Sequence, residues 1–172
     1  WTKVDQVLNM EFEIKAAEKK DMKEVLSLIK ELAKFEKEPD AVIISEDELI
    51  IHGFSDPPLF SCYVAKIESK IVGMSLGYSR YSTWKGPTMH LEDLIVTKKY
   101  RNLGIGKELF KNFIINSHLN GVKRIEWAVL NWNKHAIDFY ISNGAKVYDD
   151  WQIAQMNEKA INNFIKLNNE NT

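Results

Sequence analysis

The stretch Arg101-Asn102-Leu103-Gly104-Ile105-Gly106 follows an apolar run, Met89–Val96, and precedes a helix-like segment, Lys107–Asn120. Glycine has no β-carbon, so the backbone of this loop can approach a ligand closely. The first N–H groups of a helix lack partners within the helix and carry a partial positive charge. Arg101 adds a full positive charge. The pattern predicts a cradle for a phosphate-bearing ligand between a strand and a helix.

Two common phosphate-binding motifs do not fit this loop. The dinucleotide fingerprint requires a third glycine or alanine where Leu109 stands. The P-loop requires serine or threonine after its Gly-Lys pair, where Glu108 stands. What remains is Arg-x-x-Gly-x-Gly after a strand. From these six residues alone, a plain glycine-bearing turn before an ordinary helix stays open as the alternative.

Composition excludes several classes of function. The chain has 172 residues, of which 45% are hydrophobic, and its 23 basic and 24 acidic residues give a net charge of -1. We therefore expect a cytoplasmic protein with no nucleic-acid partner. Its four histidines show no metal-ligand spacing, and no run reaches the roughly 18 apolar residues of a membrane span, so we expect no metal and no membrane partner. Cys62, the only cysteine, is predicted to be a buried strand residue.

The pattern of apolar residues predicts one domain over residues 10–172, preceded by an extension over residues 1–9. Two capping boxes, Asp21 with Glu24 and Ser45 with Glu48, predict the starts of the first two helices. Gly53 is expected to end the second of them. Asn133 is expected to cap a helix over 134–143, and a further helix is expected to end the chain. Strands are predicted over 11–15, 60–67, 70–81, 89–96, 124–129 and 151–156.

Several segments beyond the loop carry a resemblance to a known family. They are Leu28–Glu36, Leu91-Glu92-Asp93, Asn131-Trp132-Asn133, and Phe139-Tyr140 before Asn143-Gly144-Ala145. Together with the loop they resemble the spermidine/spermine branch of the GNAT N-acetyltransferases. The resemblance implies an α/β (α+β) fold with a mixed, mostly antiparallel central sheet, helices on both faces, and a splayed site for acetyl-CoA.

The resemblance also implies which residues contact acetyl-CoA. The pantetheine arm is expected along the backbone of Leu94, Ile95 and Val96. The pyrophosphate is expected at Arg101, Asn102, Leu103, Gly104, Ile105, Gly106 and Lys107. The other side of the coenzyme is expected at Asn133, Lys134, His135 and Ala136. For Asn133, a plain helix cap is an alternative that can coexist with this contact.

Acetyl transfer to an amine needs a base, because an alkylammonium has a pKa near ~10 and only the neutral amine attacks a thioester. By resemblance, Glu92 accepts that proton directly or through water, and Tyr140 protonates the departing thiolate. Backbone N–H groups near Ile95 and Val96 are expected to polarise the thioester carbonyl. From the residues alone, Glu92 on a solvated face and Tyr140 as a core or rim tyrosine beside Phe139 remain alternatives.

A polyamine or diamine acceptor needs acidic and aromatic partners. By resemblance, the acceptor-binding residues are Phe35, Glu36, Trp84, Glu92, Asp93, Glu126, Trp127, Ala128, Asp150 and Trp151. The chain departs from that branch where Ser82 replaces an acidic residue, where Phe35 replaces a tyrosine, and in the shortened regions at Glu68 and before Trp151.

The expected activity is therefore acetyl transfer from acetyl-CoA to a polyamine or diamine by direct attack in a ternary complex, in an enzyme expected to be a homodimer. Transfer to thialysine or another small amine, or to a protein amine, is the alternative that these departures leave open. A non-catalytic acyl-CoA-binding module is a third possibility.

Overall fold

The computed structural model describes residues 11–169, so the extension predicted over residues 1–9 lies outside the described residues. The chain forms two compact units, one ending at Ala128 and one beginning at Val129. The first unit contains the sheet and the helices that pack on it. The second contains two helices, α5 (Lys134–Ser142) and α6 (Glu158–Asn169).

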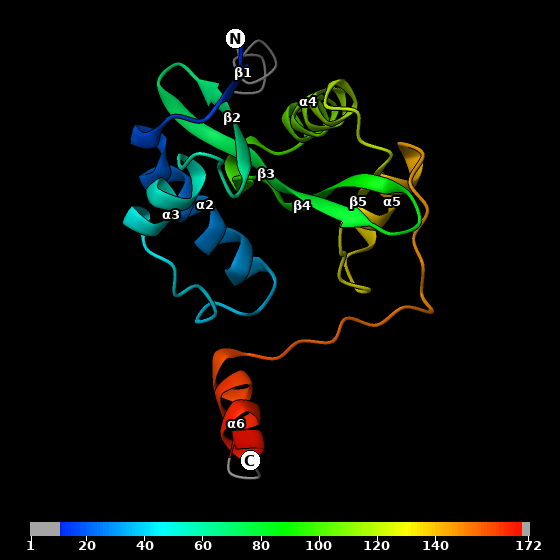
Figure 1. The fold of residues 1–172 in the computed structure, drawn as a ribbon. Coiled ribbons are helices and arrows are strands. Elements are labelled where there is room, and N and C mark those ends of the chain that lie inside the picture. Colours follow the sequence, from blue (N-terminus) through cyan, green and yellow to red (C-terminus); the bar gives the residue numbers. More distant parts are fainter. Residues whose placement is uncertain (1–10, 170–172) are drawn as a thin grey trace. The chain divides into compact units, whose positions relative to one another are not determined.

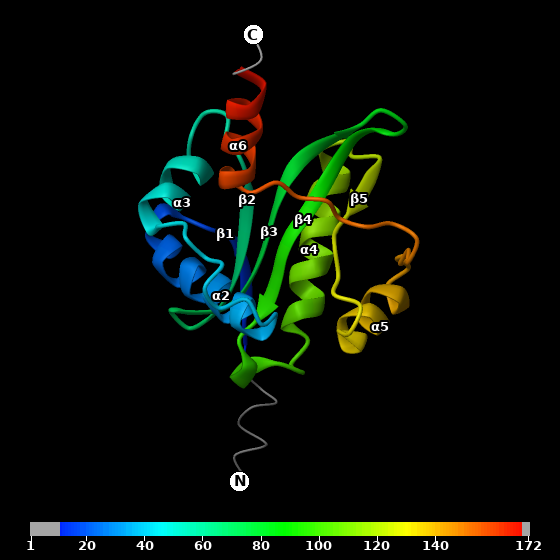
Figure 2. The ribbon, with the colours of Figure 1, turned by 90° about the horizontal axis from the view of Figure 1, so that it is seen from below.

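The first unit is built on a single five-stranded sheet, whose strands follow one another in chain order (Figure 2). Its strands are β1 (Glu13–Ala16), β2 (Ser61–Ile67), β3 (Lys70–Ser82), β4 (Gly86–Val96) and β5 (Arg124–Glu126). The first four strands pair antiparallel, and only β4 and β5 pair parallel. The prediction of a mixed, mostly antiparallel sheet is confirmed.

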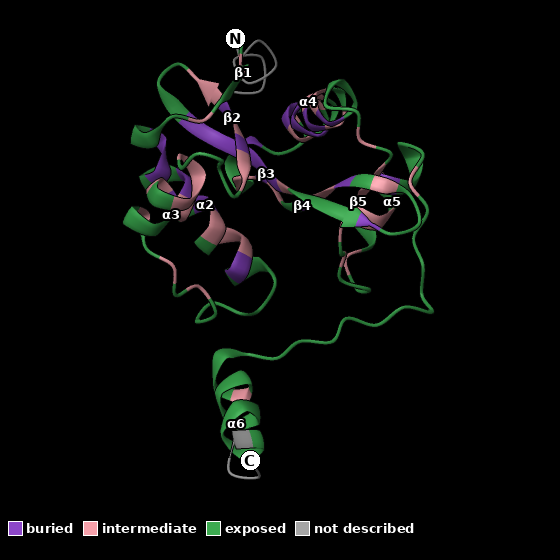
Figure 3. Ribbon diagram, viewed as in Figure 1, coloured by how far each residue is buried: buried purple, intermediate pink, exposed green. Residues whose placement is uncertain are grey.

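Helices cover both faces of this sheet, as expected (Figure 1). On one face, α2 (Met22–Phe35) and α3 (Glu46–Gly53) bury an apolar stripe. This first core contains Met22, Val25, Leu28, Leu49, Cys62, Val64, Ile71, Met74, Leu76 and Ile95. On the other face, α4 (Ile105–Leu119) packs on the sheet, and this second core contains Ala65, Val72, Tyr100, Ile105 and Leu109. Buried residues are concentrated on β2, β3 and the inner side of these helices (Figure 3).

The prediction of a capping box at Asp21 and Glu24 is wrong. The chain enters α2 through a short 3-10 helix, η1 (Lys19–Asp21), so Asp21 lies inside the helical turn and not before it. Its carboxylate accepts hydrogen bonds from the backbone N–H of Glu18 and from Lys66 Nζ, each at 2.9 Å. Glu24 instead accepts from the backbone N–H of Ile71. The second box is confirmed, because Ser45 and Glu48 cap α3 reciprocally.

Two predicted strands differ from the structure. The strand predicted over 124–129 ends at Glu126, because β5 pairs with β4 only along the three positions from Thr88 to His90. The closing strand predicted over 151–156 does not form, and this segment is extended without a sheet partner in the described part of the chain. All six of its residues are exposed, and a strand exists only where a neighbour supplies backbone hydrogen bonds. The predicted final helix is confirmed as α6.

Substitution of Gly77 in β3 tests how tightly the sheet packs on α4. A β-carbon there would lie 2.5 Å from the carbonyl oxygen of His90 and 2.5 Å from the ring of Phe113. We predict that Gly77→Ala lowers the free energy of unfolding by roughly 1–3 kcal/mol, because backbone and a buried ring must both move. Gly106→Ala is the matched control, since its β-carbon would meet Val96 at an ordinary 3.6 Å. Urea unfolding that gives equal stability for both variants would contradict this packing.

Candidate active site

Strand β4 carries an irregularity at the centre of the site. Leu76 pairs with Asp93 and the next residue, Gly77, pairs with Leu91, so Glu92 is one extra residue that faces no partner on β3. Such a β-bulge breaks the alternation of the strand and redirects the side chains beside it. The bulge explains how adjacent residues, Glu92 and Asp93, both contribute to one acidic group.

Glu36 joins these two residues from the end of α2, where it is the C-cap. We call Glu36, Glu92 and Asp93 the acidic cluster. Burial, reinforced by the charges of Glu92 and Glu36, raises the pKa of Asp93 to about 7. Burial, with a smaller effect from Glu92, also raises the pKa of Glu36. These carboxyl groups therefore repel one another in a partly desolvated place, which disfavours their charged forms.

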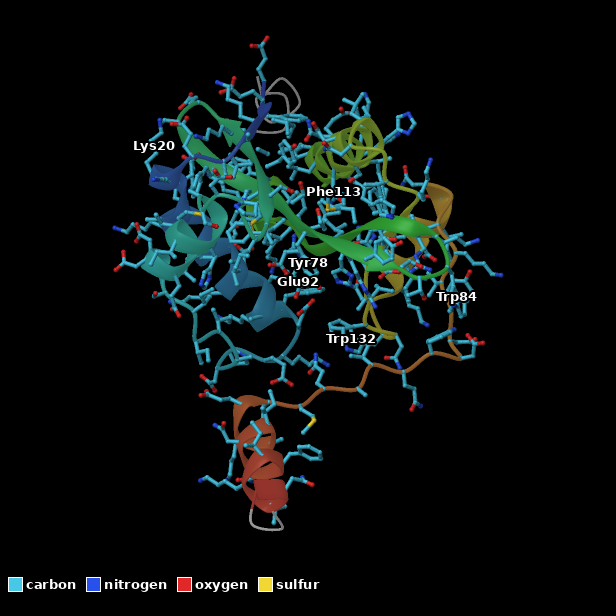
Figure 4. The ribbon with its side chains drawn as sticks, viewed as in Figure 1. Lys20, Tyr78, Trp84, Glu92, Phe113 and Trp132 are labelled. Atoms are coloured by element: carbon cyan, nitrogen blue, oxygen red, sulfur yellow. The ribbon has the colours of Figure 1, made fainter. Side chains whose placement is uncertain are left out.

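No lysine or arginine within residues 11–169 forms an ion pair with any member of the acidic cluster. The basic side chain that does contact the acidic cluster is His90, whose Nε2 lies 3.5 Å from Glu92 Oε2. The His90 ring stacks on Tyr78, with ring centroids 5.0 Å apart. Tyr78 also hydrogen-bonds to Glu92, and Figure 4 shows the two labelled side chains next to one another. Burial first, and the Glu92 charge second, raise the pKa of Tyr78.

The sheet opens beside the bulge. Because β5 pairs with β4 only from Thr88 to His90, the β5-facing edge of β4 from Leu91 to Val96 has no strand partner among the described residues. Backbone N–H and C=O groups along a free edge can pair with an extended ligand. This splay is the feature that the resemblance implies for the pantetheine arm, and it begins at the acidic cluster.

The loop after β4 has the backbone of an anion cradle. Asn102 and Gly104 adopt positive φ angles of 65° and 82°, so the chain turns sharply into α4. No side chain caps this helix, which leaves its first N–H groups directed into the loop. Gly104 is required by its φ angle, whereas Gly106 has room for a β-carbon within the protein itself. The loop therefore has the backbone features from which the sequence predicts a pyrophosphate site, and that site stays a prediction.

Arg101 is held beside the cradle by several contacts. Its Nε donates to the carbonyl of Val96 at 2.8 Å, and its Nη2 lies 3.9 Å from Glu31. The guanidinium also lies over the ring of Phe35, 5.5 Å from the ring centroid. Phe35, a predicted acceptor-binding residue, thus contacts a predicted coenzyme-binding residue.

The second unit holds the predicted acid and part of the predicted coenzyme site. Asn133 caps α5 by accepting a hydrogen bond from the N–H of Ala136 at 3.2 Å, so its predicted capping role is confirmed. Tyr140 is 9% exposed, and its ring packs edge-on against Phe139 with centroids 5.4 Å apart. The predicted acid and the predicted base therefore lie in different compact units.

Other predicted acceptor-binding residues are dispersed. Trp84 is 78% exposed in the turn after β3, where the Ser82 hydroxyl accepts from the backbone N–H groups of Trp84 and Lys85. Trp127 packs against Phe110 of α4, which is on the sheet face opposite α2. Ala128 follows it without regular structure, and Asp150 and Trp151 are exposed in the irregular segment after α5.

Glu126 has partners that the sequence analysis missed. Arg80 of β3 and Arg124 of β5 both form ion pairs with its carboxylate, the second at 2.9 Å. The predicted acidic contact is therefore neutralised by two arginines. For Arg124 a signal was present in the sequence, because it lies two residues from Glu126, which places both side chains on one face of the strand.

The chain belongs to the acetyltransferase (GNAT) family, whose model matches residues 21–145. It is therefore an acyltransferase, of a family that uses acetyl-CoA. More closely, its relatives place it in the diamine branch of that family. No group of side chains in the described residues has the composition of a metal site, and no described helix is long and apolar enough to cross a membrane.

The relatives are named for small amine acceptors. The chain is 40% identical to the thialysine N-epsilon-acetyltransferase of Bos taurus over 77% of this chain and 83% of the relative. It is 34% identical to the enzyme of the same name from Caenorhabditis elegans, over 89% and 96%. It is 33% identical to a human spermidine/spermine N(1)-acetyltransferase-like protein, over 87% of this chain and 23% of that longer protein.

Solved structures confirm the fold. An integron cassette protein from the mobile metagenome of V. cholerae superimposes with a TM-score of 0.74 at 23% identity, covering 92% of this chain and 99% of that one. An aminoglycoside acetyltransferase from an uncultured soil sample gives a TM-score of 0.73 at 20% identity, with coverage of 87% and 98%.

The raised pKa of Asp93 predicts a pH effect on stability. An aspartate in an unfolded chain has a pKa near ~3.9, so between about pH 4 and pH 7 the folded state holds a proton that the unfolded state has released. Ionisation of Asp93 thus costs stability as the pH rises. We predict that Asp93→Asn gains roughly 1–3 kcal/mol relative to wild type between pH 5 and pH 8, measured by urea unfolding.

Asp40→Asn, at an exposed position, is the control and should show no such trend. A difference between Asp93→Asn and wild type that stays constant over this pH range would show that Asp93 ionises normally.

Proposed function

We propose that this acetyltransferase acts on a primary amine of a small aliphatic acceptor, which binds as a cation at the acidic cluster. The observation that carries the proposal is the cluster itself: Glu36, Glu92 and Asp93 lie together without a lysine or arginine partner among the described residues. Bringing a cation to mutually repelling carboxylates relieves their repulsion and restores their charged forms. The site therefore favours a ligand that is positively charged when it arrives.

Acetyl-CoA supplies the acetyl group as a thioester. In this proposal the free edge of β4 at Leu94, Ile95 and Val96 pairs with its pantetheine arm, and the loop from Arg101 to Lys107 binds its pyrophosphate. The N-terminal turn of α5, Asn133 to Ala136, contacts its other side. The splay runs along β4 from Leu91 to Val96, and the cradle follows its Val96 end. A coenzyme with its pyrophosphate in the cradle therefore extends along β4 with its reacting end toward Glu92.

Glu92 is proposed to accept the proton that the acceptor must lose before it attacks the carbonyl carbon. Its carboxylate is accessible, with 52% of the side chain exposed, so a proton can reach it directly or through water. Backbone N–H groups near Ile95 and Val96 polarise the carbonyl oxygen. As the carbon–sulfur bond breaks, Tyr140 gives its proton to the departing thiolate.

Direct attack in a ternary complex is supported by the state of Cys62. It is the only cysteine of the chain, it is buried, and burial raises its pKa to about 12. A thiol in this state is a poor nucleophile, so an acyl-cysteine intermediate is disfavoured.

We propose two classes of acceptor. The sequence favours a polyamine or diamine such as spermidine. A lysine-like amine such as thialysine is the second candidate, favoured by Ser82: its hydroxyl organises the turn before Trp84 in place of the acidic group of the polyamine enzymes. The names of the relatives at 40% and 34% identity support the same candidate. We also propose, from the resemblance, that the enzyme is a cytoplasmic homodimer.

Glu92→Gln is expected to lower kcat by about 10²-fold or more, because the amide cannot accept the ammonium proton. The Kd for CoA, measured by calorimetry, should stay within a factor of about two. Glu108→Gln, in α4, where the side chain is 43% exposed, is the control. Wild-type turnover in the Glu92 variant would remove it as the base.

Tyr140→Phe is expected to lower kcat by about 10-fold or more while leaving the Kd for CoA unchanged, since the ring still packs on Phe139. Tyr148→Phe, at a 58% exposed position, is the matched control. If both tyrosine variants turn over at the same rate, Tyr140 is a packing residue and not the acid.

A further inference from the structure

A second charged group lies on the same sheet face as the acidic cluster. It consists of Arg80, Arg124 and Glu126. We call Arg80 and Arg124 the arginine pair. The two arginines bind opposite oxygens of the glutamate: Arg80 contacts Oε1, and Arg124 Nε lies 2.9 Å from Oε2. Two guanidinium groups on one carboxylate leave a net charge of one positive unit.

The strand register shows that this group and the acidic cluster share a face. Tyr78 pairs with His90, and His90 pairs with Glu126 across the next strand. Thr88 pairs with both Arg80 and Arg124 in the same way. Directly opposed residues, and residues two apart on one strand, point to the same face of a sheet. Since Tyr78 and His90 both contact Glu92, all these side chains lie on the face covered by α2.

Tyr78 lies between the two charged groups. Its hydroxyl is bound to Glu92, and the charges of Arg80 and Glu126 act on it as well. Along β3, Arg80 is three residues from Gly77, the residue opposite the bulge, which separates their Cα atoms by roughly 10 Å. The face is therefore negative at the bulge and positive a short distance away.

The arginine pair keeps donors for a ligand. The side chains of Arg80 and Arg124 are 55% and 37% exposed, and among the described residues only Glu126 pairs with them. Each guanidinium has five N–H donors in a planar fork that matches a carboxylate. If the group served only to neutralise Glu126, one arginine would be enough. The second arginine makes it a site for an additional anion.

We propose that Arg80 and Arg124 bind the carboxylate of an amino-acid acceptor, whose side-chain amine lies at the acidic cluster. The inference rests on the proposed function and specifies its acceptor: a lysine-like or ornithine-like amino acid, with an amine and a carboxylate at opposite ends. A diamine would place its second cation against the arginine pair, where like charge disfavours it. The spacing between the acidic cluster and the arginine pair suits a lysine-like or ornithine-like chain. The Glu92 and Arg80 side chains span part of the distance between the two groups, and the acceptor spans the rest.

The test uses acceptor pairs that differ only in the carboxylate: L-ornithine with putrescine, and L-lysine with cadaverine. Release of CoA thiol from acetyl-CoA gives kcat/KM for each. Wild type is expected to prefer the amino acid in at least one pair. In Arg80→Gln and Arg124→Gln, the ratio of kcat/KM for amino acid over diamine should fall by about 10-fold, mainly through the KM of the amino acid.

Glu126→Gln tests the same charge logic in the opposite direction. It removes the negative charge from between the arginines, so the ratio should rise above that of wild type. Because loss of stability would lower the turnover of both acceptors together, the ratio separates recognition from folding. Lys70→Gln, an exposed residue at the start of β3, is the control and should leave the ratio unchanged.

The outcomes are distinguishable. Thiol release with these amines, but with a ratio that neither the arginine variants nor Glu126→Gln alter, would overturn the carboxylate site and leave the proposed function standing. A wild-type preference for both diamines would also overturn it. No thiol release with any of the four acceptors, nor with spermidine or thialysine, would overturn the proposed function and this inference with it.

Discussion

The site depends on placing three carboxyl groups together without a lysine or arginine of the described chain to pair with them. Two of the three are adjacent in sequence, and an unbroken strand would direct adjacent side chains to opposite faces. The β-bulge at Glu92 removes that constraint and lets Glu92 and Asp93 act in one cluster with Glu36. The cost is visible in the raised pKa values of Asp93 and Glu36, which report repulsion and burial. A cationic ligand is what offsets that cost.

The same irregularity connects acceptor binding with coenzyme binding. Pairing between β4 and β5 stops at His90, just before the bulge, and the free edge runs from there toward the glycine loop. A strand that stayed paired would offer no backbone groups to a pantetheine arm. In the proposed function, the acceptor and the acetyl donor thus bind at neighbouring parts of one strand, which is the proximity that direct transfer needs.

Much of the fold could be predicted from sequence, because its signals are local. Apolar periodicity gave α2, and the reciprocal cap of Ser45 and Glu48 gave α3. The glycine loop was readable because Gly104 needs its positive φ angle. The capping box at Asp21 failed because a 3-10 turn precedes α2 and the half-buried Lys66 competes for the carboxylate. The strand over 151–156 failed because alternation does not supply a pairing partner.

The candidate site was predictable in part. Its acidic members were found through a motif on β4, but Arg80, one of the two partners of Glu126, comes from a different strand, and pairing across strands depends on register. Register is set by the bulge between Leu76 and Gly77, which no local pattern marks. Trp127 was placed with the acceptor by its sequence neighbours, whereas in the structure it follows β5 and packs against Phe110 of α4.

The central claim is that the acidic cluster serves acetyl transfer to a small amine. The most direct measurement is the initial rate of CoA thiol release from acetyl-CoA with spermidine, putrescine, thialysine and ornithine, each against an amine-free blank. The account predicts saturable release, with one acetylated amine formed per thiol, for at least one of these acceptors. Release no faster than the blank for all of them, from protein that binds CoA, would contradict it and leave a CoA-binding module without acetyltransferase chemistry.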